Sequence, residues 1–153
     1  MMNGAITIGT LDGANVEIRN AVGEDNIIIF GLTAKEVLDY HHFGNYRAWD
    51  IYHEKPRVKM VVEQLVNGFF DPENESFNSL YYYLLLANDE FFVLKDFLSY
   101  SAAHNILDER YRDKKQWQTS SIINIAHSGQ FSSDRTIDEY AKEIWKIKPI
   151  LVP

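Results

Sequence analysis

The sequence predicts an α/β fold with a βαβ unit at residues 1–31, a mostly α-helical region at 32–148 and an irregular tail at 149–153. Two short apolar runs, separated by a stretch with helix signals, predict the βαβ unit. Beyond residue 32, apolar residues recur at intervals of three and four, which is the pattern of amphipathic helices. The chain therefore combines a small parallel sheet with a larger number of helices.

The two strands are expected at residues 5–9 and 26–30, which are apolar and rich in isoleucine. Continuous apolarity, without alternation, is typical of a strand that is covered on both faces. Between them, Asp12 suits the N-cap of a helix over residues 13–22, and its carboxylate should accept from amides of the first turn. Gly23 suits the position just after that helix. Short connections favour a right-handed parallel βαβ unit.

The remaining elements are predicted to be helices. The clearest apolar stripe lies on residues 58–66, after Pro56 at the start of a helix. Another stripe, on the last helix, is expected to face inward and comprises Ile137, Tyr140, Ala141, Ile144 and Trp145. We expect three further helices to be capped by Thr33, Ser76 and Ser133, and three others to span about 46–52, 90–104 and 106–111. One more helix should end before Gly129, and Pro149 and Pro153 mark the tail.

Two strands are too few for an independent parallel sheet. Such sheets normally have more strands and are covered by helices on both faces. The neighbouring strands and the covering helices are missing from this sequence. We therefore expect the end portion of a larger α/β protein, since the strand edges would otherwise be exposed or paired with another copy.

Composition excludes several classes of protein. The 153 residues are 46% apolar and 24% charged, which is typical of a globular chain. No stretch of 18 apolar residues predicts a membrane span, and no basic leader with an apolar segment predicts secretion. Cysteine is absent, so disulfides, thiolate catalysis and cysteine metal sites are excluded, which fits a reducing cytoplasm.

The net charge of −7 argues against nucleic-acid binding, because phosphate neutralisation carries most of that affinity. One dense basic run exists, and acidic residues interleave with it. Its basic members are Arg110, Arg112, Lys114 and Lys115, and its acidic members are Asp108, Glu109 and Asp113. We interpret this run as a solvated helix end.

Residue chemistry alone predicts no catalytic, cofactor-binding or metal-binding residue. Gly4, Gly9 and Gly13 lack the spacing of a dinucleotide or P-loop motif and are interpreted as turn glycines. The five histidines lack metal-ligand spacing, and His127 is expected to be the most buried. The pairs Asp89–Glu90 and Asp108–Glu109 are interpreted as helix-start and surface charges. Ser120–Ser121 and Ser132–Ser133 lack a nucleophile motif, and no lysine has an apolar, glycine-rich setting.

Two long segments nevertheless resemble the glycogen/α-glucan phosphorylase family. The first is Asn-Gly-Ala-Ile-Thr-Ile-Gly-Thr-Leu-Asp-Gly-Ala-Asn-Val-Glu at residues 3–17. The second runs through residues 124–145 and includes Phe-Ser-Ser-Asp-Arg-Thr-Ile at 131–137. Residues 26–31 and 64–72 also match in the same order. The resemblance covers essentially the whole chain but only the C-terminal segment of a much longer enzyme.

The resemblance implies a Rossmann-like piece of the C-terminal domain of a GT-B glycosyltransferase. Such enzymes cleave the terminal α-1,4 link of a glucan with phosphate and release glucose 1-phosphate. They use pyridoxal phosphate, held by a lysine four positions before the residue that matches Asn3. That lysine, the phosphate-binding groups and the sugar contacts would all lie before Met1, so no site residue is carried over. The resemblance also implies that the last helices pack back across the domain boundary.

Three hypotheses follow from these observations. The first is an inactive C-terminal part of a cytoplasmic α-glucan phosphorylase, from a truncated gene, a split gene or a degraded product. The second is an assembly module that completes the sheet of a partner chain, the N-terminal part of a split phosphorylase. The third is a non-catalytic homodimer that pairs its exposed strand edges.

Overall fold

A two-stranded parallel sheet stands at the beginning of the chain in the computed structural model, which describes residues 1–73, 76–148 and 150. Strand β1 (Ile8–Gly9) pairs with β2 (Ile28–Ile29), and Ile8 lies opposite Ile28. Helix α1 (Gly13–Val22) and the 3₁₀ turn η1 (Glu24–Asn26) connect the strands. The parallel pairing is confirmed, but each strand is shorter than the five-residue run that was expected. Only two positions on each strand are paired, Ile8 with Ile28 and Gly9 with Ile29.

The sequence predicts the C-terminal cap of α1 correctly but not the N-terminal one. Gly23 adopts φ +81°, and its N–H donates to the carbonyl of Arg19, as a C-terminal glycine should. Asp12 occupies the N-cap position, but its carboxylate makes no cap bond to the first turn. It accepts instead from the hydroxyl of Thr10 at 2.9 Å, so the predicted capping bond is wrong.

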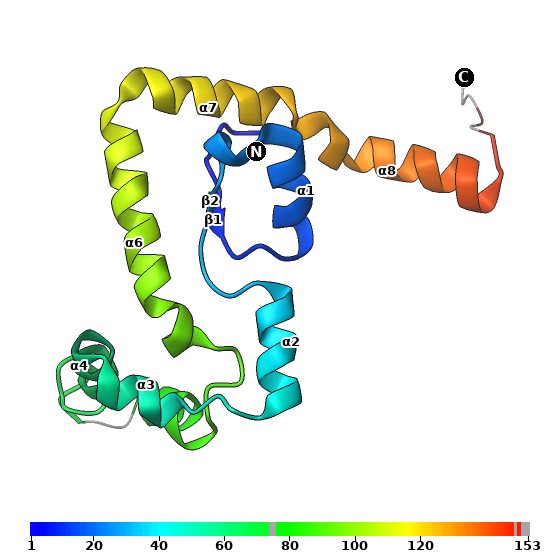
Figure 1. Cartoon of the computed structure of the whole chain (residues 1–153). Helices are drawn as coiled ribbons and strands as arrows, with labels where there is room; N and C mark the ends of the chain where they lie inside the picture. Colours follow the sequence, from blue (N-terminus) through cyan, green and yellow to red (C-terminus); the bar gives the residue numbers. More distant parts are fainter. Residues whose placement is uncertain (74–75, 149, 151–153) are drawn as a thin grey trace.

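Four helical segments form a lobe below the sheet (Figure 1). They are α2 (Ala34–Phe43), α3 (Ala48–Glu54), α4 (Pro56–Gln64) and α5 (Asn78–Tyr81), which continues into the π-helical turn η2 (Tyr82–Leu86). Thr33 begins α2, as the sequence predicts, and the structure adds a capping box that Thr33 shares with Glu36. Ser76 does not begin α5, because Phe77 takes the N-cap position and makes no side-chain cap bond.

The hydrophobic core of the molecule lies in this lobe. Its buried members are Tyr46, Ala48, Tyr52, Val58, Val62, Leu85, Phe92 and Leu94. The predicted stripe of α4 contributes two of them, Val58 and Val62, while Val61 stays partly exposed. The lobe therefore holds the largest buried cluster of the described residues, while Val22, Ile27, Ile28 and Ala103 are buried around the sheet.

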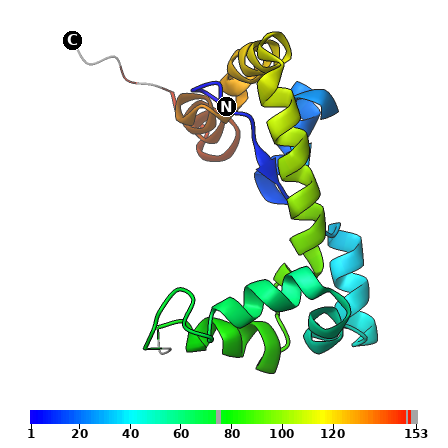
Figure 2. The same cartoon turned by 90° about the vertical axis from the view of Figure 1, so that its left-hand side faces the viewer.

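A single long helix, α6 (Val93–Arg112), connects the lobe to the upper part of the molecule (Figures 1 and 2). The sequence predicted two helices over this stretch, with a break near residue 105. No glycine or proline stands there to interrupt the backbone hydrogen bonds, so the helix continues. Helix α7 (Lys114–Ala126) follows, and Asp113 caps it by accepting from the amide of Gln116.

The chain ends in a helical arm that extends away from the rest of the molecule (Figure 1). The arm consists of α8 (Ser133–Glu139) and the π-helical turn η4 (Tyr140–Trp145), and the 3₁₀ turn η3 (Ser128–Phe131) joins it to α7. Ser132 takes the N-cap position, so the prediction of Ser133 is off by one residue. The tail prolines, Pro149 and Pro153, lie outside the described residues.

Candidate functional site

A small concave site lies where the loop before α6 meets the end of α2. The cavity measures about 310 Å³, and its lining includes Tyr40, His41, Tyr46, Asp89 and Glu90. The loop is sharply turned, because three non-glycine residues adopt left-handed backbone angles. They are Asn88 (φ +62°), Asp89 (φ +45°) and Phe92 (φ +57°). Such conformations cost free energy and persist only where surrounding contacts hold them.

Asp89 supplies those contacts. Its side chain is 3% exposed and accepts three hydrogen bonds. The hydroxyl of Tyr46 donates at 2.8 Å, and the amides of Val93 and Leu94 donate at 3.0 and 2.7 Å. Asn88 adds a bond to the carbonyl of Tyr46 and accepts from the amide of Ala48. The carboxylate therefore ties the segment before α3 to the first turn of α6.

The chemistry of this cluster is structural. Burial, together with the Asp89 carboxylate, raises the pKa of Tyr46 well above its usual value, so the phenol stays protonated and donates. Within the described residues, no group of three potential metal ligands is present. Asp89 was interpreted from the sequence as a helix-start and surface charge. It does serve the start of α6, but the surface placement is wrong, because the fold brings Tyr46 over it.

The burial of the histidine side chains also differs from the prediction. His127 is exposed, and its Nδ1 contacts the carbonyl of Ile123 at 2.9 Å. His104 on α6 is the more buried one: its ring packs edge-on against Tyr100, and its buried Nε2 has no hydrogen-bond partner among the described residues. The sequence carries no signal for this burial, because the predicted helix ends at residue 104, whereas the observed α6 continues past it and contacts β2.

A second cluster fixes the beginning of the chain. The hydroxyl of Ser121 on α7 donates to the carbonyl of Gly4 at 2.8 Å. Asn124, one turn further along α7 and fully buried, donates to the carbonyl of Asn26 at 2.9 Å. Gly4 has φ +71°, and a Cβ at this position would overlap with the Ser121 hydroxyl. Helix α7 thus holds both the segment before β1 and the turn before β2.

The other candidates from the sequence remain apart from one another. Gly9 lies in β1, and Gly13 begins α1 with φ +45°. The second serine pair lies at the start of α8, on a different helix from the first pair, which lies on α7. The basic run spans the end of α6 and the start of α7, and Arg110 donates there to the carbonyl of Asp25. The structure does not gather these residues into one reactive site.

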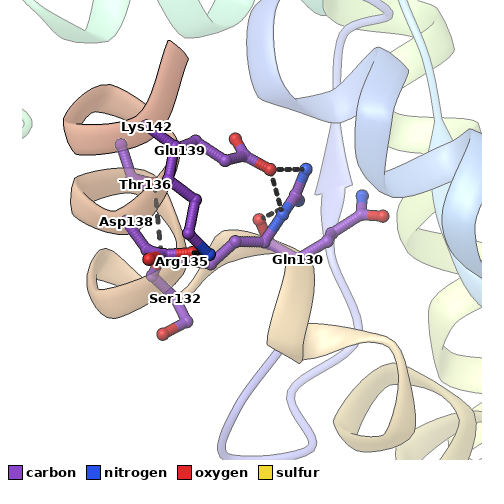
Figure 3. A network of polar contacts seen from close by, with 7 residues as sticks. All are labelled: Gln130, Ser132, Arg135, Thr136, Asp138, Glu139 and Lys142. Atoms are coloured by element: carbon purple, nitrogen blue, oxygen red, sulfur yellow. Dashed lines mark hydrogen bonds and ion pairs between the residues drawn. The ribbon is translucent and has the colours of Figure 1, made fainter. Parts of the chain in front are cut away.

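The three lysines that form ion pairs along a helix do not fit a pyridoxal phosphate site. Lys35, Lys59 and Lys142 are exposed and lie in ion pairs with acidic residues one helical turn away, such as Asp138 for Lys142 (Figure 3). An internal lysine of such a site needs an apolar setting that lowers its pKa, and the ion pairs of Lys35 and Lys142 raise it. The prediction that the cofactor lysine lies before Met1 stays a prediction.

Many large apolar side chains are exposed outside the lobe. The stripe predicted to face inward on the last helix does not do so: Ile137, Tyr140, Ile144 and Trp145 are between 45 and 64% exposed. On α7, Ile122 is 66% exposed. The apolar stripe of the last helix is therefore exposed to solvent in this structure, contrary to the prediction.

Comparison with known proteins gives a consistent result. The family model described as carbohydrate phosphorylase matches residues 1–147. Glycogen phosphorylase of Bacillus subtilis (strain 168) is 55% identical over 151 residues, which cover 99% of this chain and 19% of that protein. Glycogen phosphorylase of Synechocystis sp. is 44% identical, with 99% and 18% covered. The brain form from Homo sapiens is 43% identical, with 97% and 18% covered.

Similarity therefore extends over nearly the whole chain, while the chain spans about a fifth of the length of the curated relatives it matches. Within the described residues, no helix combines the length and apolarity required to cross a bilayer. A family match over this share of the chain, with identities of 42 to 55%, assigns the family on its own. The chain belongs to the carbohydrate phosphorylase family.

Proposed function

We propose that this chain is the C-terminal part of the C-terminal GT-B domain of an α-glucan phosphorylase. The complete enzyme would transfer a glucosyl unit from the end of an α-1,4-glucan to phosphate, using pyridoxal phosphate. The cofactor, the phosphate site and the sugar site would lie on the remainder of the enzyme, in the cytoplasm. By itself, the 153-residue chain would be inactive.

One observation carries this proposal: 55% identity to a glycogen phosphorylase extends over 99% of the chain but over only 19% of the relative. The two-stranded sheet supports the same view, because its short strands lack the neighbours that a parallel sheet needs. The match at residues 3–17 also supports a position directly after the cofactor lysine in the complete enzyme.

The test is an exchange of parts. The matching fifth of the Bacillus subtilis glycogen phosphorylase is replaced by this chain, and phosphorolysis of maltodextrin is measured as glucose 1-phosphate released. We expect activity within about tenfold of the parent enzyme, because the reacting groups would all lie on the unchanged part. A tenfold loss corresponds to about 1.4 kcal/mol of transition-state stabilisation. The isolated chain, incubated with pyridoxal phosphate and dialysed, should show neither activity nor Schiff-base absorbance.

Two results would contradict the proposal. One is a folded hybrid enzyme, in which this chain replaces the matching part of the Bacillus subtilis enzyme, that retains its cofactor but releases no glucose 1-phosphate. The other is an isolated chain that keeps a dialysis-resistant Schiff base, because that would place a cofactor lysine within these 153 residues.

A second candidate function is that of a separate module which completes the sheet of a partner chain. The open edges of β1 and β2 favour it. Mixing the chain with the complementary part of the Bacillus subtilis enzyme distinguishes the two. Co-elution with recovery of phosphorolysis supports assembly in trans, and separate elution supports a part that acts only within one continuous subunit.

Light scattering on the isolated chain tests the remaining hypothesis, a homodimer that pairs its exposed strand edges.

A further inference from the structure

The chain contains two asparagine–glycine pairs, Asn3–Gly4 and Asn67–Gly68. In such a pair the backbone nitrogen of the glycine can attack the side-chain carbonyl carbon of the asparagine, because glycine has no Cβ that obstructs the approach. The asparagine then loses its side-chain amide group. The two pairs share this chemistry, so any difference in their reactivity comes from their surroundings in the fold.

The first pair is held in place by α7. The N–H of Gly4 donates to the carbonyl of Met1 at 2.8 Å, and the carbonyl of Gly4 accepts from the hydroxyl of Ser121 at 2.8 Å. Gly4 is also buried, and a Cβ on it would overlap with the Ser121 hydroxyl. The nitrogen that would attack Asn3 is therefore hydrogen-bonded and cannot move without disturbing the contact with α7.

The second pair lies just after α4, where the backbone leaves the helix. The amide of Val66 still donates to the carbonyl of Glu63 at 3.0 Å, but the amide of Gly68 makes no hydrogen bond with any described residue. Asn67 is exposed, and Gly68 is half-buried with φ +84°. The nitrogen that would attack Asn67 is therefore available to solvent bases.

A hydrogen bond also prepares the side chain of Asn67 for attack. Its Oδ1 accepts from the amide of Phe69 at 3.1 Å, which closes a turn that contains the nitrogen of Gly68. Negative charge develops on this same oxygen when a nitrogen adds to Cγ, and an N–H directed at the oxygen stabilises that charge. The turn thus keeps Cγ near the attacking nitrogen and polarises its carbonyl group.

We propose that Asn67 is a site of spontaneous deamidation in the folded chain and that Asn3 is protected. The nitrogen of Gly68 gives its proton to a solvent base and forms a bond to Cγ of Asn67. The bond from Cγ to the side-chain nitrogen breaks, and that nitrogen takes up a proton from solvent and leaves as ammonia. A water molecule then opens the resulting succinimide at either carbonyl carbon, which gives aspartate or isoaspartate.

Both products change the segment that follows α4. Each adds a negative charge at position 67 to a chain whose net charge is already −7. Isoaspartate also inserts the Cβ of residue 67 into the backbone and so shifts the residues after it. The ring of Phe70 packs edge-on against Phe77, just before α5, with 6.0 Å between the ring centroids. Isoaspartate should therefore weaken the contact between this segment and the start of α5.

The test follows both asparagines in the 153-residue chain during incubation at mildly alkaline pH. Cleavage after glutamate releases residues 64–73, in which Asn67 is the only asparagine, and residues 1–17, which include Asn3. Tandem mass spectrometry then measures how much of each side-chain amide has become an acid. We expect Asn67 to convert at least about tenfold faster than Asn3 in the folded chain, because the protected pair must first open. In concentrated urea, where neither pair is held, the two rates should become similar.

Matched variants identify the residue that is modified. An isoaspartyl methyltransferase labels isoaspartate in the incubated chain, and Asn67→Gln should abolish the labelling, since the longer side chain does not close the same ring. Asn3→Gln is the control and should retain it.

Three outcomes would overturn the proposal. Conversion of Asn3 as fast as Asn67 in the folded chain would show that α7 gives no protection. Two intact asparagines in the folded chain, with both converting in urea, would show that the turn protects Asn67 as well. Labelling that persists in Asn67→Gln would place the modified residue elsewhere.

Discussion

Asp96 on α6 shows how a single side chain joins the two parts of the molecule. Its carboxylate accepts from the amide of Leu32 at 2.9 Å, in the segment that leads from β2 to α2. Burial raises the pKa of Asp96 above its usual value, and the nearby Asp89 and Glu36 add to the rise, while the Leu32 amide opposes it. The charged form of Asp96 is therefore less favourable in the folded chain than in the unfolded one.

The sign of the pH dependence follows from that direction. A carboxyl with a raised folded-state pKa contributes stability below its unfolded value, about 3.9, and that contribution is lost as the pH rises through the folded value. Asp96→Asn keeps an oxygen that can accept from Leu32 but carries no charge. We expect the variant to have a higher free energy of unfolding than the original chain at pH 7, with the difference shrinking toward pH 4.

Urea unfolding at several pH values measures this difference. Asp108→Asn, an exposed position on the same helix, is the control and should behave like the original chain. A lower free energy of unfolding for Asp96→Asn than for the original chain at pH 7 would contradict the prediction. It would mean that the charge-assisted bond to Leu32 outweighs the cost of burying the Asp96 carboxylate.

At the scale of elements, α7 decides where the beginning of the chain lies. The sequence correctly predicts α1, the start of α2 at Thr33 and the proline start of α4, because each has a local signal within a few residues. It does not predict the bonds from Ser121 to Gly4 and from Asn124 to Asn26, which join positions about 100 residues apart. Contacts of that kind leave no spacing pattern in the sequence.

Gly4→Ala tests the contact with α7. The left-handed φ costs an alanine about 1–2 kcal/mol, and the overlap with the Ser121 hydroxyl adds about 1–3 kcal/mol. Gly13→Ala is the matched control, because Gly13 also has a positive φ but its Cβ would meet no atom within 4 Å. Chemical unfolding should show Gly4→Ala as the more destabilised variant. Equal losses would mean that the contact between the first residues and α7 contributes nothing.

At the scale of the whole molecule, stability is expected to be uneven. The buried cluster joins α3, α4, η2 and the start of α6, whereas the sheet has two paired residues on each strand. Regions with few buried contacts open more often than a core does. Hydrogen exchange on the isolated chain should therefore find the slowest amides in α4 and early α6, and exchange at least about tenfold faster in β1, β2 and the arm. Slowest exchange in the sheet would contradict this distribution.

The sequence by itself determined the family, the parallel βαβ beginning and the starts of α1, α2 and α4, because these depend on long motif matches and on residues close together in the chain. It also predicted that the sheet is incomplete, from the number of strand candidates alone. Only the tertiary structure decided that Asp89 is buried, that His104 rather than His127 is enclosed, that α6 is continuous, and that the stripe of the last helix faces solvent. Periodicity identifies an apolar face, but whether that face is covered depends on what lies beside it in space.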